Sequence, residues 1–303
     1  MSTSLIRTAI LAASLALAGA AAHAASFQRQ VAADPRGEVD ISNVAGSIVI
    51  TGWDQPTVSV TADTEDAQRV QVKGGHGRTI VCVSYNESND CNGPGGFSER
   101  GSVSLEVHVP RGSELDVSAV SADIRSRDVV GSQHLHSVSG DISADLGSGD
   151  DEVNSVSGTI SLHGSGQEGT LHVGNVSGDV IVTNAAGELE ARTVNGSLRA
   201  ELAPARHARL NTTSGDIELK ARLEGNGSIE TETVSGDAKL DVAAPAGYSY
   251  EAKTFSGDID NCFGQRPDES RYGPGSRLNG TRGGGAGHVR MQSLSGGISL
   301  CDR

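Results

Sequence analysis

The pentapeptide Val138-Ser139-Gly140-Asp141-Ile142 decides the fold of this chain, because the sequence repeats it with small changes. Looser copies stand at Val120-Ser121-Ala122-Asp123-Ile124 and, far upstream, at Val44-Ala45-Gly46-Ser47-Ile48. From Ala122 to Gly257 the spacing of the central residue is 18, 18, 20, 18, 19, 21 and 21 residues. Self-similarity at such a period predicts stacked coils of one repeating unit. The glycines expected at the structural turns are Gly140, Gly158, Gly178, Gly196, Gly215, Gly236, Gly257 and Gly296.

The composition favours a thin aliphatic core. The chain has 303 residues, of which 3% are aromatic and 40 are Gly, so a thick core of large side chains is not expected. Small stacked units that share a narrow interior suit this composition. The formal net charge of -14 argues against nucleic acid or anionic lipid as the main partner, since both require basic patches.

Columns of the aligned repeats predict which residues face inward. Aliphatic residues recur five positions before the Gly (Leu135, Val153), two before it (Val138, Val156) and two after it (Ile142, Ile160). We expect all three columns to point into the core. Positions five and two before the Gly are three residues apart, which breaks the period of 2 of a straight strand. A corner or bulge is therefore expected between them, at Ser137, Asn175, Thr193, Thr212, Thr233 and Thr254. A second corner is expected at Ser-Gly-Asp, where Gly tolerates positive φ.

Three regions are expected along the chain. Residues 1–24 have the features of a signal peptide, with Arg7, a short apolar run and the motif Ala22-His23-Ala24, so cleavage is expected near Ala24. Residues 25–112 should form the first rung and an N-terminal β cap that protects the end of the solenoid. Residues 113–303 should form β-solenoid repeats, interrupted by a Gly-rich insertion at 264–287 that we expect to be a flexible surface loop. The apolar run is too short for a membrane span, so the mature chain is expected in the periplasm or outside the cell.

The four cysteines are expected to form two disulfides, since export makes disulfides permissible. Cys82 and Cys91 flank a short polar loop. Cys262 and Cys301 each follow the Gly of their own repeat by five residues, so they should occupy the same place on stacked turns. Stacked strands lie about 4.8 Å apart, which is within the Cα separation that a disulfide allows.

Carboxylates and imidazoles offer two candidate metal sites. The residue after the Gly is often Asp, and Asp216, Asp237 and Asp258 fall on repeats that follow one another along the chain. Such a file can bind Ca²⁺, but turn formation alone explains Asp beside Gly, so these residues are weak calcium candidates. A second column, six residues before the Gly, alternates acids and bases and includes His134, Glu152 and His172, which are Zn²⁺-type ligands. Cross-strand pairing explains this column, and no metal or other cofactor is predicted.

Catalytic signatures are absent from the sequence. It contains no G-x-S-x-G, H-E-x-x-H or P-loop motif, and all four cysteines have a disulfide interpretation. Some exported β-helices cleave polysaccharides, but such sites normally combine a cleft with aromatic contacts. We therefore expect no enzymatic activity.

The repeated V-S-G-D-I-x-L turns resemble the bacterial putative-adhesin family, a domain of unknown function that forms β-solenoids. The lead-in from Leu105 to Val117 shares this resemblance, and the chain is also similar to head domains of putative autotransporter adhesins. The resemblance covers residues 39–300 and supplies no catalytic residues.

We accordingly expect an all-β, single-stranded β-helix-like solenoid of about ten short rungs with a strand-rich N-terminal cap. Its expected role is that of an exported, non-enzymatic, adhesin-like module that contacts an envelope protein or glycan. The alternatives are a polysaccharide-acting β-helix enzyme and a calcium-stabilised β-roll. The oligomeric state and the handedness of the coil stay open.

Overall fold

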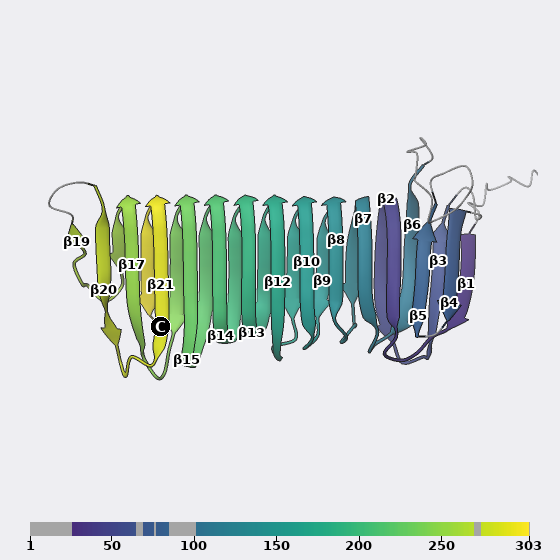
Figure 1. The fold of residues 1–303 in the computed structure, drawn as a ribbon, viewed down its shortest axis with the longest axis horizontal. Helices are drawn as coiled ribbons and strands as arrows, with labels where there is room; N and C mark the ends of the chain where they lie inside the picture. Colours follow the sequence, from purple (N-terminus) through teal and green to yellow (C-terminus); the bar gives the residue numbers. More distant parts are fainter. Residues whose placement is uncertain (1–25, 65–68, 76, 85–100, 270–273, 303) are drawn as a thin grey trace, which may run out of the picture.

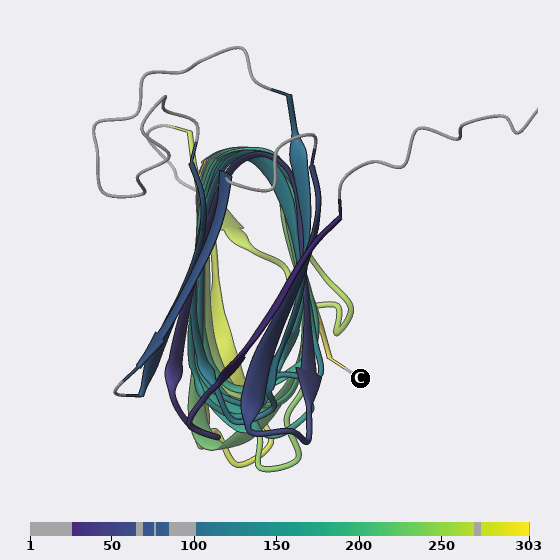
Figure 2. The same cartoon turned by 90° about the vertical axis from the view of Figure 1, so that its right-hand side faces the viewer.

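The computed structural model describes residues 26–64, 69–75, 77–84, 101–269 and 274–302, and its elements are the β-strands β1 to β22. They stack along one axis into a long, flattened tube with two walls (Figures 1 and 2). The fold is all-β and solenoid-like, as predicted. The predicted signal peptide, residues 1–24, lies outside the described residues.

Among the described residues, no helix is long and apolar enough to cross a membrane.

Each coil runs once along each wall, either as two strands or as one long strand that bends from one wall to the other. β8 (Gln133–Ser139) ends at the Ser-Gly-Asp corner, and β9 (Ile142–Leu146) returns along the other wall. The next coil repeats this path, so that β10 pairs with β8 and β11 pairs with β9, both in parallel. The strands of the following coils are β10 (Asp150–Ser157), β11 (Ile160–Gly164), β12 (Glu168–Ser177), β13 (Val180–Asn195), β14 (Leu198–Ser214), β15 (Ile217–Ser235) and β16 (Ala238–Ala243). The corners follow the arrowheads along the upper edge in Figure 1.

Two of the three predicted inward columns form the core. The residues two after the Gly, such as Ile142 and Ile160, are fully buried, and so are those five before it, such as Leu135 and Val153. Aliphatic side chains from the two walls therefore meet across a narrow interior. Their burial is the main stabilising contribution to the fold.

The prediction for the column two before the Gly is wrong. Val138 and Val156 are each 48% exposed, and Val176, Val194, Val234, Phe255 and Leu294 are exposed as well. The strand keeps its period of 2 up to the corner, so the position three before the Gly faces inward and the next one faces out. Consequently no corner lies at the Ser, Thr and Asn positions where we expected it. These residues are buried at the inner side of the Ser-Gly-Asp corner: Ser137, Ser155, Asn175, Thr193, Thr212, Thr233, Ser293 and Thr254.

Each corner fits closely onto the corner of the neighbouring coil. Gly196 has a φ of 153°, and a Cβ on it would clash with the carbonyl oxygen of Gly178. Its amide donates to Ser214 O at 3.0 Å, and Thr212 Oγ1 donates to its carbonyl from inside at 3.4 Å. Glycine is therefore required here both by conformation and by the space between coils.

The N-terminal end departs from a simple stack. β2 (Glu38–Trp53) pairs in parallel with β7 (Glu114–Arg127) on one side and with β5 and β6 on the other. After β2 the chain forms β3 to β6 at the N-terminal end of the stack. It then returns to the other side of β2 and continues there as β7. β3 pairs antiparallel with β6, β1 with β3, and β4 with β5. The strands of this cap are β1 (Ser26–Ala32), β3 (Thr57–Asp63), β4 (Val70–Gly75), β5 (Arg78–Val83) and β6 (Val103–Pro110). The predicted domain boundary at residue 112 falls in the turn before β7 and stays a prediction.

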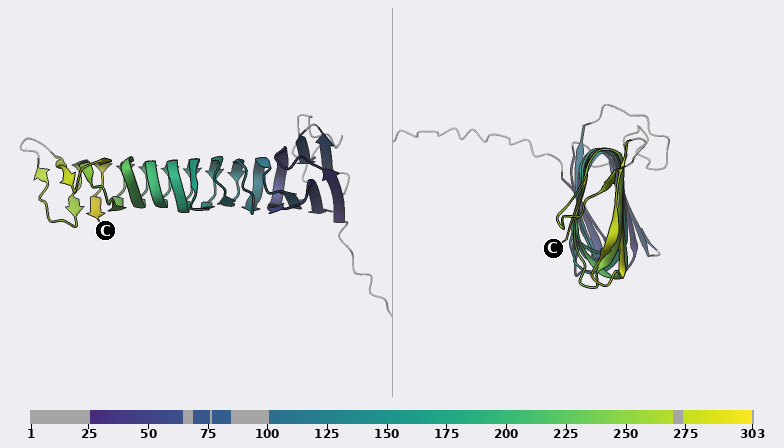
Figure 3. Two further views of the ribbon diagram at one scale, coloured as in Figure 1. Left: turned by 90° about the horizontal axis from the view of Figure 1, so that it is seen from below. Right: turned by 90° about the vertical axis from the view of Figure 1, so that its left-hand side faces the viewer.

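The C-terminal end contains an inserted coil. β17 (Tyr248–Ser256) and β18 (Ile259–Asn261) follow β16 along the chain, but β21 (Gly287–Ser295) and β22 (Ile298–Asp302) lie between them and the β15–β16 coil. β21 pairs in parallel with both β15 and β17, and β22 pairs with both β16 and β18. Figures 1 and 3 show this order at the C-terminal end. The last coil of the sequence is therefore not the last coil in space.

The Gly-rich insertion is more ordered than predicted in its described part. It contains β19 (Asp268–Glu269) and β20 (Ser276–Arg282), and β20 pairs antiparallel with β17 over seven residues. Residues 270–273 of the insertion lie outside the described residues. An antiparallel strand therefore covers the edge of β17 here, as β3 covers β6 and β4 covers β5 at the other end.

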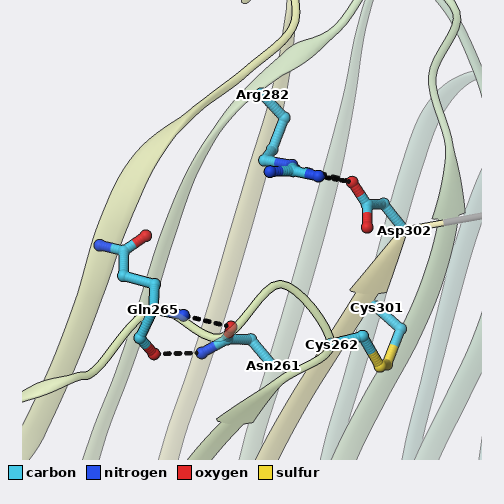
Figure 4. Close-up of a disulfide and its surroundings, with 6 residues drawn as sticks. All are labelled: Asn261, Cys262, Gln265, Arg282, Cys301 and Asp302. Atoms are coloured by element: carbon cyan, nitrogen blue, oxygen red, sulfur yellow. Dashed lines mark hydrogen bonds and ion pairs between the residues drawn. A yellow bond between two sulfur atoms is a disulfide. The ribbon is translucent and has the colours of Figure 1, made fainter.

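A disulfide joins the inserted coil to the outer one. Cys262 and Cys301 are bonded, with 4.9 Å between their Cα atoms, and Cys262 N donates to Leu300 O (Figure 4). The nearby Arg282 pairs with Asp302 at 2.7 Å, which ties β20 to β22. The predicted pairing of Cys82 with Cys91 stays a prediction, because Cys91 lies outside the described residues.

The corner predicts a strong effect of Gly196→Ala. The Cβ would force an unfavourable φ and push apart two stacked coils, so we expect the free energy of unfolding to fall by about 2–5 kcal/mol. Urea denaturation followed by circular dichroism measures this change. Gly75→Ala is the matched control, because a Cβ at this position in β4 of the cap would have no atom within 4 Å of it. Equal urea midpoints for the two variants would contradict the close packing of the corners.

The disulfide predicts a loss of stability in Cys262→Ser/Cys301→Ser. The bond closes a sequence separation of 39 residues, which corresponds to about 4 kcal/mol in the chain-entropy description of disulfides. In this variant we expect the inserted coil of β21 and β22 to open first. Its amide hydrogens should then exchange faster than those of β10 and β11. Uniform exchange rates in wild type and variant would show that the bond does not hold the inserted coil.

Candidate functional site

An exposed file of apolar side chains runs along the corner edge of the solenoid. Each member stands two residues before the corner Gly, and seven of them are 42–55% exposed. The flanking residues pair in register from coil to coil, so the side chains stack into one continuous row. We call this row the apolar ridge; in spatial order it is Val138, Val156, Val176, Val194, Thr213, Val234, Leu294 and Phe255.

The inserted coil completes the apolar ridge. Leu294 lies between Val234 and Phe255 because β21 lies between β15 and β17. Sequence reasoning placed these side chains in the core, since it took every aliphatic column as buried. The signal that could have corrected this is the Ser, Thr and Asn column next to it, which by a period of 2 from the core must face inward.

A file of aspartates lies beside the apolar ridge, just past the corner. Most of these carboxylates accept a backbone N–H of the next coil: Asp141 Oδ1 from Thr159 N at 2.8 Å, and Asp179 Oδ1 from Ser197 N at 2.9 Å. We call this row the Asp file; its members are Asp123, Asp141, Asp179, Asp216, Asp237 and Asp258. One oxygen of each such carboxylate thus forms a hydrogen bond that joins two coils, and the negative charge remains at the surface.

The weak calcium candidates do not form one cluster. Asp216 Oδ1 accepts Asp237 N at 2.9 Å, and Asp237 Oδ1 accepts Gly297 N at 2.7 Å. The sequence suggested that Asp258 lies next to Asp237. It does not, because the inserted coil places Gly297 between them. The hydrogen bonds of Asp216 and Asp237 support the turn role that the sequence offered as the other explanation.

The column six residues before the Gly forms a ladder of alternating charge. Its spatial order is Asp116, His134, Glu152, His172, Glu190, Arg209, Glu230, Arg290 and Glu251. Arg209 pairs with Glu230 at 3.1 Å and Arg290 with Glu251 at 3.6 Å. Arg290 on the inserted coil separates Glu230 from Glu251, which would otherwise repel. Such exposed pairs each contribute about 0.2–1 kcal/mol.

The zinc candidates lie in register on this ladder. His134 and His172 flank Glu152 on adjacent strands, and Glu152 accepts a hydrogen bond from Asn154 at 2.7 Å. Among the described residues, the groups with three ligand atoms within metal-binding reach are confined to Glu38, Asp40 and Asp116.

That acidic group lies at the N-terminal end, where β2 pairs with β7. Arg78 forms ion pairs with Glu38 and Asp40, so a cation of the chain itself already neutralises part of the group. Burial, followed by the nearby Asp40 carboxylate, raises the pKa of Glu38. The group is therefore explained as an internal ion-pair network.

A polar hollow of about 510 Å³ lies on the outer wall near the C-terminal end. His207, Ser228, His288 and Ser249 alternate across its four strands, with His207 Nδ1 and Ser228 Oγ 2.7 Å apart and His288 Nδ1 and Ser249 Oγ also 2.7 Å apart. Ser249 Oγ donates to Gly287 O at 3.2 Å, so it accepts from the imidazole. The Ser249 hydroxyl thus gives its proton to the backbone and is not poised as a nucleophile.

The carboxyl group of Asp151 is buried beside Glu152 of the charge ladder. Asp151 is 4% exposed, and its Oδ1 accepts the backbone N–H of Gln133 at 2.9 Å. Burial raises the pKa of Asp151 to about 6, although the Gln133 N–H opposes this shift. Because the folded pKa is higher than the unfolded value of 3.8, the folded state binds the proton more tightly. Stability from this group is therefore complete below about pH 4 and is lost as the pH rises through about 6.

This carboxyl predicts that Asp151→Asn stabilises the protein in neutral solution only. The amide oxygen still accepts from Gln133 N, and the cost of the buried charge, up to about 3 kcal/mol, disappears. We expect a higher urea midpoint for the variant at about pH 8 and equal midpoints near about pH 4. A constant difference between the two proteins over this range would show that Asp151 titrates normally.

Several solved structures match this chain over most of its length, at low identity. A putative adhesin from Bacteroides fragilis NCTC 9343 has 11% identity and a TM-score of 0.43, over 92% of this chain and 97% of that one. A putative adhesin from Parabacteroides distasonis ATCC 8503 has 13% identity and a TM-score of 0.32, over 93% and 98%. A protein named as a putative lipid binding protein from the same strain has 12% identity and a TM-score of 0.36, over 92% and 96%. A search of curated proteins found no match.

The family follows from the sequence match over the stacked coils. The family model described as Toastrack DUF4097 matches residues 37–301, from the start of β2 to β22. This range contains the repeated corners, the apolar ridge and the inserted coil, so the chain belongs to the Toastrack DUF4097 family.

Proposed function

We propose that this protein is an exported, non-enzymatic solenoid of about ten rungs that acts as an adhesin-like interaction module of the cell envelope or cell surface. Its partner is an envelope protein or glycan. The observation that carries the proposal is the apolar ridge, in which seven large apolar side chains of one row are 42–55% exposed. Contiguous exposed apolar surface of this kind marks interaction sites.

The way the ridge is built supports a binding role. Thr213 occupies one position of the row, so a polar β-branched side chain fits this place in the fold. The valines are therefore not required by the geometry of the corner. Leaving an apolar side chain half exposed forgoes about 1 kcal/mol of burial at each position, and a partner that covers the row recovers it.

The chemistry of the polar groups supports a non-enzymatic role. The pair Ser249 and His288 brings a hydroxyl within 2.7 Å of an imidazole on the polar hollow, but the hydroxyl donates to a backbone carbonyl. Asp141, Asp179, Asp216 and Asp237 of the Asp file accept backbone amides, and Glu251 pairs with Lys253, Arg277 and Arg290. These groups stabilise neighbouring strands, whereas the apolar side chains of the ridge are half exposed.

Export is proposed from the leader. Arg7, the short apolar run and the Ala22-His23-Ala24 motif support secretion and cleavage near Ala24. The disulfide between Cys262 and Cys301 suits an oxidising compartment, because cytosolic conditions keep such thiols reduced.

The function is tested by capture from envelope extract with the mature chain as bait. The ridge variant replaces Val138, Val156, Val176 and Val194 by Thr, the residue that already occupies position 213 of the row. We expect it to lose at least about ten-fold of the captured protein or glycan, since four apolar contacts are removed. The control Ile80→Thr/Val130→Thr changes two exposed aliphatic residues away from the ridge and should capture as wild type does.

Three outcomes would overturn the proposal. Equal capture by wild type and ridge variant would exclude the ridge as the binding surface. New reducing ends after incubation with envelope polysaccharide would establish an enzyme instead. A large rise in melting temperature with millimolar Ca²⁺, abolished in Asp216→Asn/Asp237→Asn, would establish a calcium-stabilised roll.

A further inference from the structure

We infer that the apolar ridge receives an amphipathic α-helix with a basic border, which lies along the four consecutive valines Val138, Val156, Val176 and Val194. We call these four residues the valine quartet. This inference rests on the proposed function and adds the chemical class of the partner. Three features of the surface carry it: the spacing of the ridge, the trough beside it and the charge on its other side.

The spacing of the valine quartet matches the turns of an α-helix. Stacked strands are about 4.8 Å apart, so the three steps of the quartet span about 14 Å. Three turns of an α-helix span about 16 Å, and the difference of about 2 Å is within the reach of side-chain rotamers. Alternate side chains of an extended strand are about 6.6 Å apart and would span about 20 Å, which slips by more than one rung. A helix therefore keeps one apolar side chain between each pair of valines.

A trough beside the valine quartet leaves room for the body of the partner. A hollow of about 510 Å³ is bordered by Val176 and Val194 on one side and by Asn154 and Arg192 on the other. Gly174 lies in register between Asn154 and Arg192, and its lack of a side chain leaves space there, which Asn154 Oδ1 enters close to the place of a Cβ. Arg192 is directed to Glu190 by an ion pair, which keeps it at the rim of the trough.

Charge decides which kind of helix fits. Asp141 and Asp179 are exposed beside the valine quartet, and each uses Oδ1 for a backbone amide of the next coil. The negative charge of these carboxylates is therefore held in place by the fold and does not depend on flexible side chains. Lys or Arg residues that border the apolar face of a helix would meet this row, while an acidic helix or an anionic lipid surface would be repelled.

A second copy of the chain in antiparallel orientation is a poorer occupant on the same grounds. Two ridges that pack face to face in antiparallel orientation place one Asp file opposite the other. Like charges held opposite each other oppose association. A separate cationic helix has no such conflict.

The test uses a synthetic peptide of about 18 residues with Leu at heptad positions a and d and Lys at the flanking positions. Fluorescence anisotropy measures its affinity for the full mature protein in low salt. Two matched peptides accompany it, one with Glu in place of Lys and one with the same Leu and Lys residues in an order without helical periodicity. We expect the Lys peptide to bind at least about ten-fold more tightly than either.

Protein variants separate the two contributions. Replacing the valine quartet by Thr should weaken binding of the Lys peptide at least about ten-fold. Asp141→Asn/Asp179→Asn keeps the Oδ1 acceptors and removes two charges, so binding should weaken about two- to five-fold and lose part of its salt dependence. Ile80→Thr/Val130→Thr should bind as wild type does.

The inference is overturned if the Glu peptide or the aperiodic peptide binds as tightly as the Lys peptide, or if the Thr variant binds unchanged. It is also overturned if the wild type alone sediments as a dimer that the Thr variant loses, or binds vesicles of phosphatidylglycerol through the valine quartet. If the Lys peptide does not bind but capture from envelope extract still depends on the ridge, the helix is rejected and the proposed function stands. Failure of both would reject the ridge as a binding surface.

Discussion

The close stacking of one corner on the next is the constraint on which the rest of this structure depends. At Gly196 the backbone has a φ of 153°, and a Cβ would clash with the carbonyl of Gly178 in the neighbouring coil. Backbone hydrogen bonds then join the coils on both sides of the corner, as between Leu198 N and Asp216 O at 2.9 Å. Because the coils meet in this way at the corner, the columns of side chains next to the corner are held in register from coil to coil.

Register gives each column a single physical role. Aliphatic residues five before and two after the Gly form the core, while Ser, Thr and Asn three before it reach the corner from inside. Asp after the Gly accepts an amide of the next coil, as Asp141 does from Thr159 N. Repetition therefore turns a weak local contact into a continuous surface. The apolar ridge and the Asp file are such surfaces, and they run side by side along one edge.

The inserted coil shows how the ends solve a problem that repetition creates. A stack of parallel strands exposes unpaired backbone at its ends, and here an antiparallel strand, β20, closes the C-terminal one. The coil of β21 and β22 returns between its predecessors, which places Arg290 between Glu230 and Glu251 and Leu294 between Val234 and Phe255. Charge alternation and the apolar ridge both continue through this exchange. The Cys262–Cys301 disulfide and the Arg282–Asp302 ion pair hold the exchanged order.

The sequence by itself determined the repeating coil, the glycine corners and two of the core columns, because these depend on local spacing and on residues that recur in every repeat. It also placed Cys262 and Cys301 in equivalent positions of their repeats. The tertiary structure showed that the Val138 column faces solvent; the Ser, Thr and Asn column beside it already indicated this, but an aliphatic residue next to a corner is compatible with either orientation. The tertiary structure alone decided the order of the last coils, because a parallel strand accepts any partner with a matching pattern. Packing, and not position along the chain, therefore decides which coils are neighbours in space, and it separates Asp237 from Asp258.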